Sequence, residues 1–308
     1  MNSKQQVKAY TMLKYQAEVL NTLFSAVVRQ NVAPGVWNWL NEKVAPAHNS
    51  QSFNIAFVSV PRKTGKAAIP LTDEQAADIR EAGAGLTIGG WTIDRLCRVW
   101  LLANADHADE EKYVQTVENL FLTAEVNELV ALYSALPVLA YPERWVKRCA
   151  EGIRSNIGAA LEAIMCNNPY PAVYLNEPAW NQLILKAFFT EKPVEQIIGI
   201  DARANADLAK TLSDYAHERW AAHRPVNPQI WRCTGKFINA DILQDMERLF
   251  ASEHDFDREA AALACSDSQY PPAQQLLNKN QNIKSAIISG QLSWNALAEK
   301  MKNYVLQS

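Results

Sequence analysis

The chain of 308 residues has 48% hydrophobic residues, 20% charged residues and a formal net charge of −3. Such a chain can bury a sizeable core, and its low glycine content favours helix over a glycine-rich β fold. The charge gives no basic stripe for nucleic acid, and no apolar run reaches the roughly 18 residues of a membrane-spanning helix. Charged and polar residues run through the N-terminus, unlike a secretory signal. We therefore expect a cytoplasmic protein that neither binds nucleic acid nor spans a membrane.

Helical periodicity begins close to the N-terminus. Apolar residues at helical spacing predict a first helix over residues 4–30, and Pro34 suits the first turn of a short second helix. Residues 53–60 (FNIAFVSV) alternate and are rich in β-forming side chains, so they predict one short strand or extended segment ending at Pro61. Thr72 is the expected N-cap of a further helix.

Neither the glycines nor the cysteines predict a cofactor or metal site. Residues 63–66 (KTGK) lack the spacing of a phosphate-binding loop, and the glycines within 83–90 follow no strand, unlike a dinucleotide-binding loop. The five cysteines are widely spread and form no C-x-x-C motif: Cys97, Cys149, Cys166, Cys233 and Cys265. We interpret them as buried or incidental thiols, and we expect no cofactor and no bound metal.

The remaining chain has the rhythm of short helices joined by short turns. The periodicity predicts helices near 91–104, 109–122, 124–136, 143–167, 177–190, 205–222, 239–252, 256–265, 271–279, 282–289 and 292–305. Repeated antiparallel helix pairs predict an all-α fold, an irregular α-solenoid similar to HEAT-repeat proteins, with only the segment near 53–60 extended. We expect an N-terminal helical part over 1–140 and a C-terminal part over 141–308, together forming one continuous domain.

Polar residues interrupt the apolar faces of three of these helices. Arg154 and Asn156 lie on opposite borders of the apolar stripe predicted for 143–167. Asn181 lies beside the core face of the next helix, near Trp180, and the rigid loop before that helix contains Tyr170. Buried polar groups need partners, so Arg154 either extends to solvent or meets an anion, and Asn181 either holds a loop carbonyl or contacts a small molecule.

The helix over 205–222 places Arg219 near the middle of its apolar face, where the guanidinium must be paired or meet an anionic group. Structural pairing with Glu151 or Asp201 is the first hypothesis. Asp214 and Glu218 lie together on one flank of the helix, with His217 beyond them. Their spacing could hold a metal, but no second metal-binding motif occurs, and acid–base use of His217 lacks an assignable nucleophile.

We expect the polar groups of these consecutive helices to converge in one region, because helices joined by short connections are usually neighbours. The expected ligand-binding residues are Arg154, Asn156, Tyr170, Trp180, Asn181, Arg219 and Trp220. Aromatic walls with a few polar groups would suit a ring-bearing metabolite.

The same segments resemble the EboA-domain family over roughly residues 50–265. The motifs that carry the resemblance are VPR (60–62), LVALYSALP (129–137), AEGIRSN (150–156), NPYP (168–171), WNQLILKA (180–187) and LSDYAHERW (212–220). The resemblance implies an all-helical cytoplasmic protein from a small bacterial gene set linked to metabolite traffic, including precursors of the pigment scytonemin. Other members of that set resemble a membrane prenyltransferase, sugar-phosphate-type cyclases and hydrolases. The resemblance supplies no catalytic residues, so the site candidates depend on helix geometry.

Three hypotheses follow. The leading one is a non-catalytic binding or adaptor protein for processing and export of a bacterial secondary metabolite, either a pigment precursor or a cyclitol-like compound. Its partners would be that metabolite or products of the same gene set, such as the membrane prenyltransferase. The second is an enzyme that acts on the metabolite with His217, Asp214 and Glu218, and the third is a structural scaffold. A pocket at these side chains would favour a ligand or an enzyme, whereas a closed network would favour the scaffold.

Overall fold

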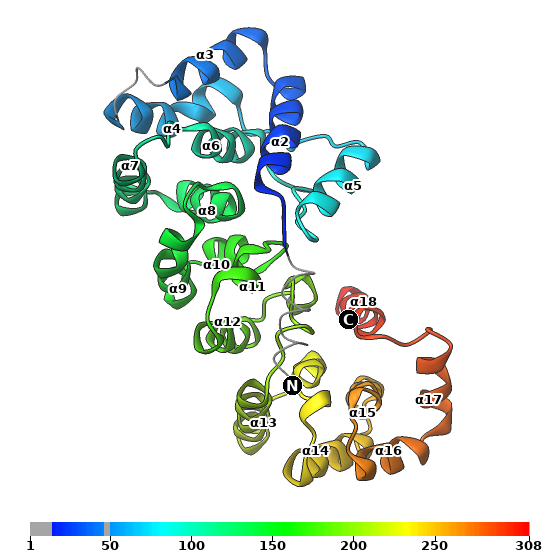
Figure 1. Cartoon of the computed structure of the whole chain (residues 1–308). Helices are drawn as coiled ribbons and strands as arrows, with labels where there is room; N and C mark the ends of the chain where they lie inside the picture. The colour runs from blue at the N-terminus through cyan, green and yellow to red at the C-terminus, as the bar shows by residue number, and fades with distance from the viewer. Residues whose placement is uncertain (1–13, 46–49, 308) are drawn as a thin grey trace. The chain divides into compact units, whose positions relative to one another are not determined.

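The computed structural model describes residues 14–45 and 50–307, and the chain forms two compact units (Figure 1). The first unit takes the chain through Trp180 together with Gln196–Ile198, and the second takes Asn181–Glu195 and the chain from Gly199 onward. The boundary between Trp180 and Asn181 falls within the helix over Glu177–Phe189, and the division expected at residue 140 stays a prediction. Each unit is described separately below.

Within the described residues the structure is helical and contains no strand, which confirms the all-α prediction. One isolated antiparallel bridge joins Ala68 to Thr92. No helix of the described ranges has the length and hydropathy needed to cross a bilayer. The solenoid arrangement stays a prediction.

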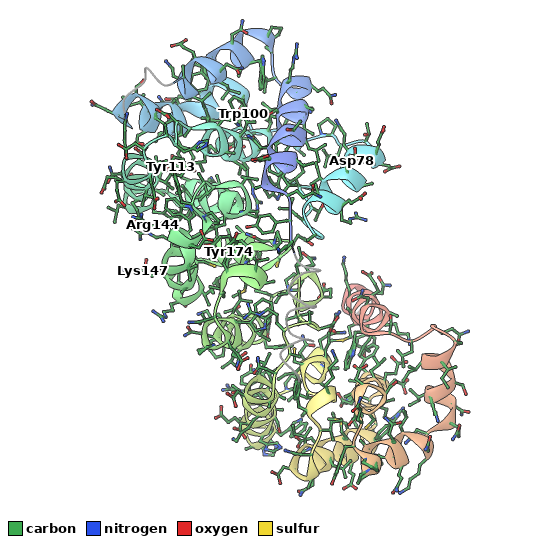
Figure 2. All side chains as sticks on the ribbon, viewed as in Figure 1. Asp78, Trp100, Tyr113, Arg144, Lys147 and Tyr174 are labelled. Atoms are coloured by element: carbon green, nitrogen blue, oxygen red, sulfur yellow. The ribbon has the colours of Figure 1, made fainter. Side chains whose placement is uncertain are left out.

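Unit 1 is organised around α6 (Ile93–Asn104), which packs against α2, α4 and α8. Its other elements are α2 (Ala17–Asn31), α3 (Pro34–Val44), α4 (Ser50–Thr64), α5 (Asp73–Ala82), α7 (Glu110–Thr123), α8 (Val126–Ala135), α9 (Val146–Arg154), α10 (Gly158–Met165) and α11 (Tyr170–Tyr174). Figure 2 shows Trp100 and Tyr113 directed among the helices, where both are buried, whereas the exposed side chains of Asp78 and Lys147 project outward. The predicted cap is present, because Thr72 and Gln75 form a capping box at α5.

The prediction of an extended segment over 53–60 is wrong, because these residues form the middle of α4. Phe53, Ala56, Phe57 and Val60 are all buried, and their spacing is that of one helical face. Ile55 and Val58 are 61% and 53% exposed, so the apparent alternation came from branched side chains on the solvent side. Tertiary burial of the helical face outweighs their preference for strands.

The long helix predicted over 143–167 is two helices. A 3₁₀ turn over Pro142–Trp145 leads into α9, the chain leaves helical conformation after Arg154, and α10 begins at Gly158. Gly152 explains the close packing at this point: a Cβ atom there would lie 2.6 Å from Cζ of Tyr133 and 2.5 Å from Cδ1 of Ile164. The apolar stripe predicted for 143–167 therefore does not form one continuous helix face.

The first helix also begins later than predicted within the described chain. Residues 14–16 are irregular, and the Gln16 amide donates to the Ala82 carbonyl at 2.8 Å, so α2 begins at Ala17. The earlier part of the predicted helix, up to residue 13, lies outside the described residues.

Unit 2 is organised around α15 (Asp255–Asp267), whose buried face is rich in alanine and packs against α14, α16 and the 3₁₀ helix η4 (Pro228–Cys233). The small side chains allow this close approach from several sides. The other helices are α13 (Ala206–Ala221), α14 (Ala240–Phe250), α16 (Pro271–Asn278), α17 (Gln281–Ile288) and α18 (Trp294–Gln307). The helix α12 (Glu177–Phe189) carries the chain from unit 1 into unit 2.

Candidate functional site

Two capped helices of unit 2 form the walls of the candidate site. The Asn205 side chain accepts from the Leu208 amide at 2.8 Å and begins α13, which buries Leu208 and Leu212. Asn239 likewise accepts from the amides of Asp241 and Ile242 and begins α14. These caps satisfy amides that would otherwise lack partners, and so they fix where each helix starts.

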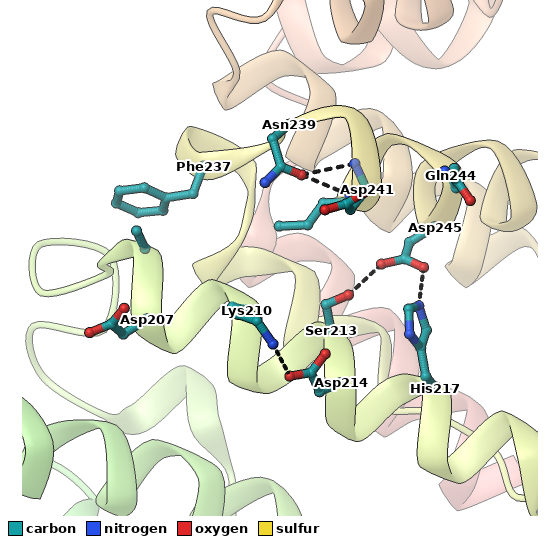
Figure 3. Close-up of a pocket in the computed structure, with 12 residues that line it drawn as sticks. Asp207, Lys210, Ser213, Asp214, His217, Phe237, Asn239, Asp241, Gln244 and Asp245 are labelled. Atoms are coloured by element: carbon teal, nitrogen blue, oxygen red, sulfur yellow. Dashed lines mark hydrogen bonds and ion pairs between the residues drawn. The ribbon is translucent and has the colours of Figure 1, made fainter.

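A cleft of about 590 Å³ lies between α13 and α14 (Figure 3). It is lined by Ala206, Asp207, Lys210, Ser213, Asp214, His217, Phe237, Asn239, Asp241, Ile242, Gln244 and Asp245. Figure 3 shows Phe237 at one end of this cleft and the Asp245–His217 pair at the other. Its volume suits a small molecule.

Asp245 is the most buried ionisable group of the cleft, with 3% of its surface exposed. One carboxylate oxygen accepts from Ser213 Oγ at 2.6 Å, and the other lies 2.5 Å from Nε2 of His217. The Asp245 carboxylate therefore joins α13 to α14 and uses both oxygens to do so. A buried carboxylate is stable only with such partners.

The order of these three groups decides what they can do. In a nucleophilic triad the histidine lies between the serine and the carboxylate, so that it can remove the serine proton. Here Asp245 lies between Ser213 and His217, and Nε2 of His217 is directed at the carboxylate. Ser213 therefore has no imidazole base in this arrangement.

The remaining cleft wall is predominantly acidic. Asp207, Asp214 and Asp241 are exposed, and the ammonium of Lys210 pairs with Asp214 at 2.6 Å. Carboxylates accept hydrogen bonds from hydroxyl and ammonium groups, whereas they repel anions. The cleft therefore suits a hydroxyl-bearing or amine-bearing molecule better than an anionic one.

A family model described as metabolite traffic protein EboA matches residues 20–235. The chain belongs to this family. The match contains all of α13 and ends before α14 begins. No curated protein and no solved structure matches the chain.

Two of the three catalytic candidates on α13 line the cleft and the third does not. Asp214 and His217 line the cleft, but Glu218 is exposed and is not among the residues that line it. The side chain of His217 is 55% exposed despite its contact with Asp245. Among the described residues no cluster of three or more His, Cys, Asp or Glu side chains could hold a metal.

Asn181 and Arg219 lie near opposite ends of α13. The side-chain amides of Asn181 and Asn205 bond reciprocally, at 3.1 and 2.8 Å, at the start of that helix. Arg219 lies near its end and donates to the Pro225 carbonyl at 2.6 Å. At 1.5 Å per residue the two sites are about 20 Å apart, so unit 2 does not bring them together. The carboxylates expected to pair with Arg219 have other partners: Glu151 pairs with Arg148 and Asp201 with Arg232.

Trp220 packs against Trp231 and Arg248 in unit 2. Its ring stacks on Trp231 with centroids 5.8 Å apart, and the Arg248 guanidinium lies 4.2 Å from the Trp220 ring centroid. Stacking of this kind stabilises the helix packing. Trp220 is not among the residues that line the α13–α14 cleft.

Four of the expected ligand-binding residues belong to unit 1. Arg154 ends α9 and is exposed, and Asn156 is exposed in the turn that follows. Tyr170 is buried; its hydroxyl donates to the Pro142 carbonyl at 2.6 Å, and burial raises the pKa of that hydroxyl. Trp180 is fully buried at the end of the unit. A ligand role for these residues, and their convergence with Arg219, stays a prediction.

The sequence reasoning missed Asp245, although a signal for it was present. Ile242, Met246 and Leu249 form the buried stripe of α14, and Asp245 lies within it. A carboxylate on such a stripe requires donors from another element. The same argument that selected Arg219 would therefore have selected Asp245.

Proposed function

We propose that the protein is a non-catalytic binding protein of bacterial metabolite traffic that holds a hydroxyl-bearing or amine-bearing small molecule in the α13–α14 cleft. The observation that carries this proposal is the Asp245 carboxylate, bonded to both Ser213 and His217. It gives the cleft a fixed shape and gives Ser213 no imidazole base. The membership in a family of metabolite traffic proteins supports the same conclusion.

The side chains around Asp245 have roles that suit binding. The exposed carboxylates of Asp207 and Asp241 are free to face a ligand's hydroxyl or ammonium hydrogens, and the Asn239 side chain is already used to cap α14. Phe237 offers an apolar surface against which the carbon face of a ring can lie. Rings with many hydroxyls, such as cyclitols, combine these two kinds of surface.

The cellular setting extends the resemblance to the EboA family. In this proposal the protein acts in the cytoplasm and binds a secondary-metabolite precursor of pigment or cyclitol type during its processing and export. It also binds products of the same gene set. A membrane prenyltransferase is one such partner. The first step of the proposal, ligand binding by unit 2, can be tested without knowing the partner.

Native mass spectrometry of the protein purified from its host tests this step. Gln244→Trp should block the cleft, because Gln244 is an exposed lining residue of α14. Glu247→Trp is the matched control, since Glu247 is exposed on the same helix but does not line the cleft. We expect a bound small molecule in the wild type and in Glu247→Trp, and its loss in Gln244→Trp.

Two results would oppose the proposal. Equal occupancy in Gln244→Trp and Glu247→Trp would place the ligand elsewhere. Conversion of the recovered molecule during incubation with the wild-type protein would instead support the enzyme hypothesis, and loss of that conversion in His217→Ala would assign it to this cleft.

A further inference from the structure

A second cleft lies on the other side of α13. At 100° per residue, Tyr215 and Arg219 project from the side of the helix opposite to Ser213 and His217. The cleft has a volume of about 370 Å³ and lies wholly within unit 2. It is lined by Phe188, Glu191, Tyr215, Arg219, Pro225, Val226, Asn227, Pro228, Ile230 and Met301. Most of these side chains are apolar or aromatic, in contrast to the acidic wall of the α13–α14 cleft.

Arg219 is held in place by neutral acceptors. Its Nε donates to the Pro225 carbonyl at 2.6 Å, and its Nη1 lies 3.4 Å from the Tyr215 hydroxyl. The guanidinium also lies 5.9 Å from the centroid of the Tyr215 ring. These contacts fix the orientation of the planar group, which lowers the entropy cost of binding a ligand to it.

The charge of Arg219 is not neutralised within the described part of the chain. No carboxylate of the described residues lies within ion-pair distance of Arg219, although Glu191 lines the same cleft. The half-buried guanidinium places its positive charge beside the apolar walls of the cleft. A cation in such a setting favours an anionic group.

We propose that this cleft binds a small molecule with an apolar or aromatic body and a single terminal carboxylate. The carboxylate would meet Arg219, and the body would lie against Phe188, Tyr215 and Met301. Glu191 disfavours a second negative charge on the ligand, because like charges in one cleft repel. This site is independent of the α13–α14 cleft, since the two have opposite electrostatic preferences and lie on different sides of the helix.

Isothermal titration calorimetry with 3-phenylpropionate tests the proposal, and 3-phenylpropanamide serves as a neutral probe of nearly the same shape. We expect the wild type to bind the carboxylate at least about tenfold more tightly than the amide, as a hydrogen bond to a charged group implies. Arg219→Gln should weaken carboxylate binding by about the same factor and leave amide binding nearly unchanged.

Met301→Trp should prevent binding of both probes, because it fills the cleft from α18 without altering Arg219. Glu247→Trp, on the surface of α14, should bind both probes as the wild type does. Circular dichroism would show that each variant is folded, and the comparison of carboxylate with amide in the wild type needs no variant. The proposal is overturned if the wild type does not bind 3-phenylpropionate at millimolar concentration, binds the amide equally well, or keeps its affinity in Arg219→Gln or Met301→Trp.

Discussion

A buried charge network in unit 1 gives the sharpest stability prediction. Arg98 is 3% exposed and connects three helices: its Nε donates to the Phe57 carbonyl of α4 at 3.1 Å, and its Nη1 to Asp94 of α6 at 3.1 Å. Its Nη2 lies 3.6 Å from a carboxylate oxygen of Glu128 in α8. Burial lowers the pKa of Arg98, and the two carboxylates oppose that shift.

We expect Arg98→Met to lower the free energy of unfolding by about 3–5 kcal/mol. The methionine fills much of the space, but it leaves the buried carboxylates of Asp94 and Glu128 without their cation and removes the donor to the Phe57 carbonyl. Adding Asp94→Asn and Glu128→Gln removes both charges, so the triple variant should recover at least about 2 kcal/mol of this loss. The Glu125 amide donates to the Glu128 carboxylate at 3.1 Å, and glutamine at 128 keeps a side-chain oxygen that can accept this hydrogen bond.

Urea denaturation followed by circular dichroism would measure these changes. Hydrogen exchange of peptides from α4, α6 and α8 would assign the change to unit 1, because a chain of two units need not unfold in one step. Arg80→Met on the exposed face of α5 is the control and should change stability by no more than about 0.5 kcal/mol. A loss below about 1 kcal/mol for Arg98→Met, or a triple variant no more stable than the single one, would refute the reasoning.

Three further predictions concern packing, capping and thiol reactivity. Gly235→Ala should cost about 1–3 kcal/mol, because the new Cβ would lie 2.7 Å from the Ala264 carbonyl oxygen. Gly35→Ala, in α3 with open space around it, should leave stability unchanged or raise it by up to about 1 kcal/mol, and similar denaturation midpoints for both variants would contradict this. Asn205→Ala should cost about 1–2 kcal/mol through loss of the α13 cap, and Asn205→Asp, which keeps a capping oxygen, should cost less by the same measurement. In the native protein at pH 8, iodoacetamide should label Cys166 before the four buried cysteines. Burial hides those four thiols from the reagent and raises the pKa of each. Uniform labelling of all five cysteines by mass spectrometry would oppose this prediction.

The sequence predicted helices correctly where local signals, such as capping residues, agreed with tertiary packing. Thr72 caps α5 as predicted, because a cap depends on residues within one turn, and Asn205 caps α13 in the same way. Residues 53–60 were misassigned because their composition favours a strand, while the helical spacing of the buried side chains is visible only once exposed Ile55 and Val58 are set aside. The break after Arg154 falls at Ser155 and Asn156, whose side chains favour turns, and the helical wheel drawn through 143–167 passed over this local signal.

The sequence predicted the site residues that lie on one helix, but not the contacts that depend on how two helices pack. Asp214 and His217 were identified from α13 alone, but the pairing of His217 with Asp245 joins residues 28 apart and depends on how α13 and α14 pack. Arg219 was selected as a group that needs an anionic or paired partner, and in the structure its Nε donates to the Pro225 carbonyl, six residues along the chain. A main-chain acceptor in a turn has no side-chain signature in the sequence.

The close packing at Gly152 has a consequence for sequence variation within the family. Because a Cβ at this position would meet the Tyr133 ring, the two positions share one fixed volume. Relatives with alanine or serine at 152 should carry a smaller or more flexible residue at 133, and relatives that keep tyrosine at 133 should keep glycine at 152. An alignment of the family would therefore show these two columns changing together, although the residues are 19 positions apart in the chain.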